Sequence, residues 1–204
     1  MTSKKKTIFF DAAGTLFYVS RGVGFHYSNI AAKYGVVADA AFLDQRFHEI
    51  FQKSVPLSLQ NTNQEEREKA EKKWWYDLVR LVFLDIPFPA FDPFFETLYT
   101  FFQQGVGQED GSWALFPESR EVLERLTLLG HPIGLISNFD SRIKSVLESL
   151  QIVHFFQTIT FSGEAGFAKP SPLIFQHALK KAACLAHDAI HVGDHLIYDI
   201  EGAK

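Results

Sequence analysis

The hydrophobic pattern of the chain changes between strand-like runs and helical spacing. Short apolar runs bounded by turn residues lie at 7–10, 132–137, 156–161 and 189–192, which is typical of strands buried on both faces. The last three runs alternate with helical segments. This alternation predicts a parallel sheet with right-handed crossovers, and therefore an α/β fold.

Between residues 25 and 104 the apolar positions follow helical spacing, and no strand is expected there. Four helices are predicted from caps and breakers: Gly35 ends the first, Asp39 caps the second, Asn63 with Glu66 forms a capping box for the third, and Asp92–Pro93 starts the fourth. After residue 110, further helices are predicted at 117–129, 140–150 with Asp140 as its cap, and 171–183.

The long helical stretch interrupts the strand-containing parts of the chain. We therefore predict two domains: an α/β core formed by residues 1–24 and 105–204, and a helical cap domain formed by residues 25–104. Glycine-containing linkers at 18–24 and 105–111 are expected to join them.

Composition narrows the class of protein. The chain has 204 residues, of which 47% are hydrophobic and 22% charged, so it is expected to bury a core. The net charge is −4, so the chain lacks the excess of positive charge that is typical of nucleic-acid-binding proteins. Cys184 is the only cysteine, which is typical of a reducing compartment, and no apolar run is long enough for a signal peptide or a membrane span. We expect a cytoplasmic protein without a nucleic-acid or membrane partner, and the sequence leaves the oligomeric state open.

Polar residues follow the predicted strands. Asp11 comes after the first strand, Ser137 and Asn138 after the second, and Asp194 after the last. Because the carboxyl ends of parallel strands meet at one edge of a sheet, these side chains are expected to lie together. Lys169 could neutralise a nucleophile and a transferred group there.

Three carboxylates, Asp11, Asp194 and Asp199, offer the hard oxygen ligands that Mg²⁺ prefers. The simplest alternatives are that Asp11 only caps a turn and that Lys169 is a surface lysine. The aromatic residues of the helical segment, including Trp74 and Trp75, are interpreted as core packing.

The stretches 7–17, 137–140, 168–170 and 191–195 together resemble the four motifs of the haloacid dehalogenase (HAD) superfamily, in order and spacing. The helical insert lies where the C1 cap of that superfamily lies, and the resemblance covers essentially the whole chain. It implies a Rossmann-like, three-layer α/β core with a parallel sheet and an inserted α-helical C1 cap. It says little about the substrate.

By this resemblance, Asp11 attacks the substrate and forms an aspartyl intermediate, and Lys169 orients it. The phosphoryl group would be held by Ala12, Thr15, Ser137 and Asn138. The cofactor would be Mg²⁺, with a site made by Asp11, the carbonyl of Ala13, Asp194 and the supporting Asp199. The implied activity is hydrolysis of a small phosphorylated or otherwise anionic substrate.

Ala13 departs from the phosphatase pattern. Phosphatases of the superfamily have a second Asp there, whose acid–base help is worth roughly two to four orders of magnitude. The relatives without it are haloacid dehalogenases, which need no metal, and phosphonoacetaldehyde hydrolases, which use a cap lysine. Three functions therefore stay open: a weak phosphatase, a haloacid dehalogenase or phosphonate-type hydrolase, and a catalytically silent phosphate-binding or regulatory protein.

The candidates to replace the missing acid are Tyr18, His26 and His195, and the lysines of the helical segment include Lys33 and Lys53. The last residues, 199–204, look like the start of a helix. If the chain ends at Lys204, the strand at 189–192 is expected at an unprotected edge of the sheet. Because the superfamily normally adds at least one more strand, we expect further residues beyond Lys204.

Overall fold

The computed structural model describes residues 5–60, 62–103 and 111–204. Within these residues, four parallel strands form one sheet in the order β5–β4–β1–β6, with the bounds Thr7–Phe10 (β1), Ile133–Ser137 (β4), Thr158–Phe161 (β5) and Ala189–Val192 (β6). The strands predicted from the apolar runs are therefore confirmed, and so is the predicted α/β class.

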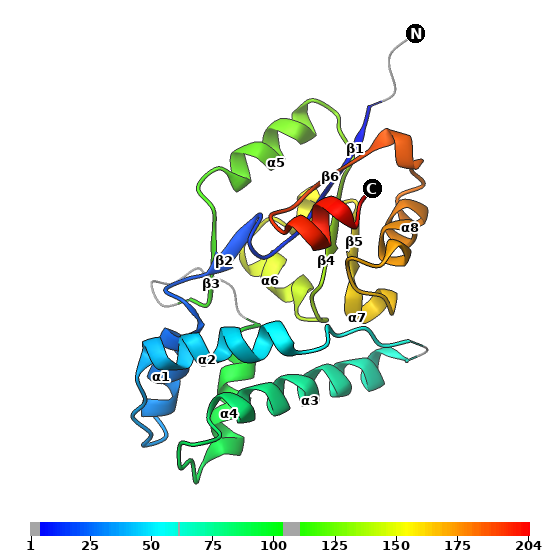
Figure 1. The fold of residues 1–204 in the computed structure, drawn as a ribbon. Helices are drawn as coiled ribbons and strands as arrows, with labels where there is room; N and C mark the ends of the chain where they lie inside the picture. The colour runs from blue at the N-terminus through cyan, green and yellow to red at the C-terminus, as the bar shows by residue number, and fades with distance from the viewer. Residues whose placement is uncertain (1–4, 61, 104–110) are drawn as a thin grey trace.

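Helices cover both faces of this sheet (Figure 1). On one face, Ile8 and Phe10 share a buried cluster with residues of α5 (Ser119–Leu128) and α6 (Ile143–Ser149). On the other face, Phe9 packs with Ile174 of α8 (Pro172–Lys181). Successive β1 side chains point to opposite faces, so this short apolar strand joins three layers.

A separate group of helices lies beyond the carboxyl ends of the strands (Figure 1). These are α1 (Val23–Ala32), α2 (Ala40–Lys53), α3 (Gln64–Val82) and α4 (Phe91–Phe101), and they share their own buried cluster. The predicted caps are confirmed: the Asp39 side chain accepts from the amide of Phe42, and Asn63 with Glu66 forms the capping box. Gly35 follows α1 with φ +80°, as its role in ending the helix requires.

Two features differ from the sequence prediction. Asp140 does not cap α6, because that helix begins at Ile143 with Arg142 in the cap position. The Asp140 carboxylate instead accepts from the backbone amide and the side chain of Arg142. The predicted linker at 18–24 overlaps β2 (Phe17–Val19), which pairs antiparallel with β3 (Trp113–Leu115). This ribbon has three-residue strands far apart in sequence, so no local hairpin signal marks it.

The remaining short elements are α7 (Ser162–Ala165), the 3₁₀ turns Val153–Phe155 and Ala186–Asp188, and the π-helical segment η3 (Leu196–Glu201). Among the strands of the described residues, β6 lies at one edge of the sheet. Of the predicted linker 105–111, all but Gly111 lies outside the described residues. Among the helices in the described ranges, none has the length and apolar character needed to cross a membrane.

Candidate active site

Asp11 lies where β1 ends, and the sheet itself fixes its position. Its amide donates to the carbonyl of Val192 on β6 (2.8 Å), and the residue is 7% exposed. The chain then turns sharply: the amide of Leu16 donates to the carbonyl of Ala12, and Gly14 has φ +97°. This turn brings Ala12, Ala13 and Gly14 around the carboxylate.

Lys169 joins two of the predicted carboxylates. Its Nζ atom lies 2.6 Å from Asp11 Oδ1 and 2.5 Å from Asp199 Oδ1, and the lysine is 3% exposed. It is therefore not a surface lysine. Its backbone is held by Asn138, whose side-chain amide exchanges two hydrogen bonds with the amide and carbonyl of Lys169 (2.7 and 2.9 Å).

The two carboxylates have different environments. Burial raises the pKa of Asp11 above its ordinary value, and the positive charge of Lys169 opposes this effect. Burial also acts to raise the pKa of Asp199, but hydrogen bonds from His191 and Lys169 outweigh it and hold that pKa below its ordinary value. Both oxygens of Asp199 are engaged, since Oδ2 accepts from the amide of His195 (3.0 Å).

Asp194 completes an acidic group with Asp11 and Asp199. One oxygen from each residue lies within 4.8 Å of the others. A Cβ atom on Gly14 would lie 2.7 Å from Asp194 Oδ2, so the residue at position 14 must lack a side chain for Asp194 to lie here. Thr15, a predicted phosphoryl-binding residue, donates from its hydroxyl to Asp194 Oδ1 (3.1 Å).

The other predicted phosphoryl-binding residues, Ala12, Ser137 and Asn138, differ in burial and in which of their groups are free to bind. Ser137 is 3% exposed at the end of β4, and Ala12 is fully buried. The side-chain amide of Asn138 is occupied by Lys169, so its backbone amide is the group left for the predicted role. Ala13 is exposed and has no side-chain group that could transfer a proton.

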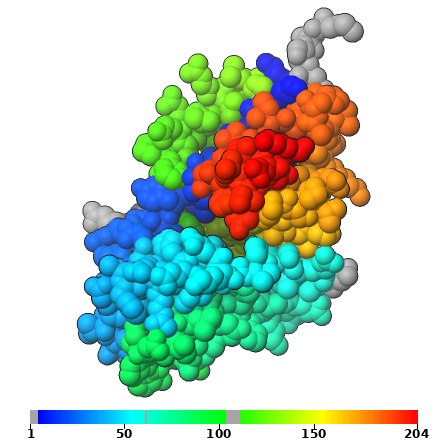
Figure 2. Space-filling view, in the orientation of Figure 1, coloured from blue at the N-terminus to red at the C-terminus, as the bar shows by residue number. Residues whose placement is uncertain are grey.

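A cavity of about 730 Å³ opens over these residues, between the helical layer and the strand ends. The molecular surface is hollowed where α2 meets the C-terminal segment (Figure 2). Asp11, Ala13, Ser137, Asn138, Lys169, Asp194 and Asp199 all line this cavity. Sequence reasoning correctly grouped these residues from separate strand ends.

Sequence reasoning missed the opposite wall of the cavity. Trp74 and Trp75 pack in the helical cluster, as predicted, but they also line the cavity. Arg142 and the pair Asp44 and His48 line it as well. The spacing of Asp44 and His48, four residues apart on a predicted helix, was the one available signal for that pair.

The three candidates for the missing acid are placed differently. Tyr18 and His195 line the cavity. His195 Nδ1 accepts from the amides of Ile197 and Tyr198 (3.3 and 3.2 Å), which fixes its ring. His26 lies instead against Phe101 and Phe102, with Nε2 2.6 Å from the carbonyl oxygen of Ser20. Of the three candidates for the missing acid, Tyr18 and His195 therefore line the cavity and His26 does not.

This arrangement defines a class: an α/β protein with a buried carboxylate, a lysine paired with it and a group of three carboxylates at the strand ends. The model of the haloacid dehalogenase-like hydrolases matches residues 5–204, and the chain belongs to this family. It is a hydrolase of the HAD superfamily, which confirms the resemblance drawn from the four motifs.

Named relatives agree with this assignment. Haloacid dehalogenase-like hydrolase domain-containing protein 3 of Danio rerio is 32% identical over 94% of this chain and 78% of its own length. A glyceraldehyde 3-phosphate phosphatase of Pyrococcus abyssi is 40% identical, over 43% of this chain and 37% of its own length. The relatives of this hydrolase therefore include a phosphatase.

Solved structures show the same fold. A dehalogenase superposes with a TM-score of 0.68 at 16% identity, covering 100% of this chain and 82% of the other. A HAD hydrolase of Bacillus subtilis bound to magnesium, described as revealing interdomain movement, superposes with a TM-score of 0.65 at 14% identity, covering 98% and 85%. At these identities the likeness establishes the fold alone.

Proposed function

We propose that this hydrolase is a Mg²⁺-dependent phosphohydrolase of small phosphorylated molecules, with Asp11 as its nucleophile. The observation that carries the proposal is the position of Asp11: it is buried at a strand end, bonded to Lys169, and grouped with two further carboxylates beneath one cavity. These parts suit phosphoryl transfer, in which positioning and charge stabilisation supply most of the catalysis.

The donor set suits a hard cation. Asp11, Asp194 and Asp199 offer carboxylate oxygens, and a single lysine charge leaves this group with an excess of negative charge. Asp11, Asp194 and the carbonyl of Ala13 would hold Mg²⁺. Asp199, with both oxygens engaged, would support the site by holding Lys169. Bound Mg²⁺ would stabilise negative charge on the phosphoryl oxygens.

The residues of the chain account for the remaining steps. A carboxylate oxygen of Asp11 attacks phosphorus and forms an acyl phosphate, and the leaving group departs with the electron pair of the broken P–O bond. Lys169 stabilises the added charge, and Ser137 donates to a phosphoryl oxygen. Water then attacks the intermediate, gives its proton to solvent or to a cavity base, and releases inorganic phosphate and Asp11.

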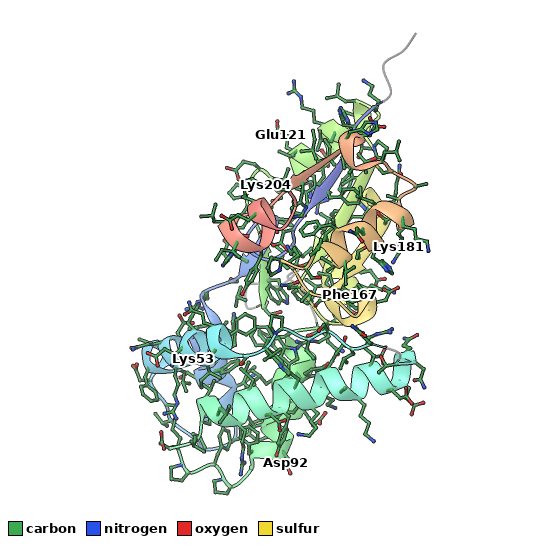
Figure 3. All side chains as sticks on the ribbon, turned by 45° about the vertical axis from the view of Figure 1, so that its right-hand side comes forward. Lys53, Asp92, Glu121, Phe167, Lys181 and Lys204 are labelled. Atoms are coloured by element: carbon green, nitrogen blue, oxygen red, sulfur yellow. The ribbon has the colours of Figure 1, made fainter. Side chains whose placement is uncertain are left out.

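The acidic group favours this reaction over the metal-free dehalogenase alternative. A phosphonate-type reaction would need a lysine of the helical layer close to the substrate. In the described part of the chain, the cavity lining includes neither Lys33 nor Lys53, and Lys53 lies at the end of α2 (Figure 3). The silent phosphate-binding alternative is separated from the proposal by activity measurements.

Mg²⁺ is expected to stabilise the folded protein, because it binds the acidic group in the native state and not in the unfolded chain. At about a hundredfold excess over its dissociation constant, thermal melts should shift upward by roughly 5 °C or more. Asp194→Asn should lose most of this shift, while Asp77→Asn, at an exposed position on α3, should keep it. A wild-type melting temperature that does not change with Mg²⁺ would favour the metal-free dehalogenase alternative.

We also propose that α1–α4 act as a cap domain that moves as a unit to admit substrate. Contacts between α3 and the loop after β4 would hold the closed state: the Glu71 carboxylate accepts from the amide of Ser141 (3.0 Å), and Trp75 Nε1 donates to Asp140 (2.5 Å). Burial raises the pKa of Glu71 to about 7. A cap that opens must break these hydrogen bonds.

Structures determined with and without a phosphate analogue are therefore expected to differ by a rotation of the whole helical layer. The internal cluster of the layer should stay intact, and the pairs Glu71–Ser141 and Trp75–Asp140 should separate in the open form. An identical placement of the layer in both structures would argue against a moving cap.

A further inference from the structure

The wall of the cavity opposite Asp11 is aromatic. Helices α2, α3 and α4 contribute Phe47, Phe51, Trp74, Trp75 and Tyr99 to it. The rings contact one another: Phe51 stacks on Trp75 with 6.0 Å between centroids, and Trp75 meets Trp74 edge-on at 4.9 Å. A flat apolar group entering the cavity would find several ring faces and edges to pack against.

The cations that line the cavity already have anionic partners. Lys169 is bonded to Asp11 and Asp199. Arg142, which is 7% exposed, makes two hydrogen bonds to the Asp140 carboxylate, at 2.9 Å from Nε and 2.6 Å from Nη2. The positive charge of each side chain is therefore already balanced by a buried carboxylate, and neither offers an uncompensated charge to a second anionic group on the substrate.

The helical layer adds no lysine or arginine to the described cavity lining. Its charged contributor is Asp44, and His48 Nδ1 lies 2.8 Å from the Asp44 carbonyl oxygen and 3.5 Å from its carboxylate. A second phosphate or a carboxylate on the substrate would therefore face aromatic rings, an acidic side chain and polar groups such as Gln52, with no lysine or arginine of this layer in the described lining. Desolvating such a group without a partner is unfavourable.

We propose that the substrate carries a flat, apolar or aromatic leaving group and no second anionic group. This inference rests on the proposed function, because it assumes that the phosphoryl group lies at Asp11. An aryl phosphate or an aromatic acyl phosphate meets both conditions, whereas a sugar bisphosphate or a phosphorylated aliphatic carboxylic acid meets neither.

The first test compares benzoyl phosphate with acetyl phosphate in the presence of Mg²⁺. Both are acyl phosphates with carboxylate leaving groups, so they differ mainly by the ring. Burial of that ring should raise kcat/KM for benzoyl phosphate by about tenfold or more. Phe51→Ala should remove much of this preference. Phe42→Ala is the matched control, since Phe42 lies on the same helix, is similarly exposed (46% against 44%) and does not line the cavity.

The second test compares phenyl phosphate with 4-carboxyphenyl phosphate. The carboxylate makes the phenol a better leaving group, so leaving-group chemistry alone would favour the charged substrate. The aromatic wall predicts the opposite: kcat/KM should be higher for phenyl phosphate than for 4-carboxyphenyl phosphate.

Equal rates for the two acyl phosphates, equal effects of Phe51→Ala and Phe42→Ala, or preference for the carboxylated substrate would each overturn the inference while leaving the phosphohydrolase proposal intact. A protein that binds Mg²⁺ in thermal melts but hydrolyses none of the four compounds would overturn the proposed function, and the inference with it.

Discussion

Replacing Asp11 with Asn is expected to lower phosphatase turnover by at least about a thousandfold, because the amide is a poor nucleophile in place of the carboxylate. The substitution keeps the size of the side chain and an acceptor oxygen for Lys169. Lys169 also keeps its contact with Asp199. The variant should therefore fold, and the measurement is the steady-state rate on an acyl phosphate with Mg²⁺.

The matched control is Asp77→Asn, the same substitution at an exposed position paired with Lys73. It should retain wild-type turnover, and circular dichroism should give the same spectrum for both variants. An Asp11→Asn protein that turns over substrate at a rate close to wild type would remove Asp11 from the role of nucleophile.

Ala13→Asp is expected to raise turnover on alkyl phosphates by about tenfold or more, within the range typical of general acid–base catalysis. Ala13 is exposed and lines the cavity, so a longer side chain can extend toward the reacting groups. An alkoxide leaving group needs a proton, whereas an aryloxide or carboxylate does not. The gain should therefore be larger on a sugar phosphate than on an aryl phosphate.

Ala13→Asn separates proton transfer from the effect of side-chain size, because its amide has the same shape and cannot act as an acid or a base at neutral pH. It should give no gain. A wild-type protein that hydrolyses sugar phosphates briskly and loses activity with Asp at position 13 would show that another cavity residue, such as Tyr18 or His195, already serves as the acid.

The strands and the site edge were predictable because their signals are local. Four apolar runs predicted the parallel sheet, and the polar residues after three of them, Asp11, Ser137 and Asp194, predicted the edge that carries the site. The capping box at Asn63 is likewise a pattern within four residues. Such features are decided by backbone chemistry near the residue in question.

Features that depend on distant residues were not predictable in the same way. The ribbon of β2 and β3 pairs Phe17 with Leu115, and no short pattern specifies that register. Asp140 looked like a helix cap, but the buried pairing with Arg142 and Trp75 took precedence. The aromatic cavity wall also depends on tertiary structure. Residues that pack in the core and residues that line the cavity have the same helical spacing, so the sequence pattern does not distinguish them.

Detection of the covalent intermediate tests the central claim most directly. Wild-type protein mixed with acetyl phosphate and Mg²⁺, quenched in acid and mapped by mass spectrometry, should carry one phosphoryl group on the peptide that contains Asp11. Because Ala13 supplies no base for the second step, the adduct should accumulate, and hydroxylamine should release it. Steady hydrolysis with a phosphoryl group on another residue, or with none on Asp11 at any quench time, would contradict the account.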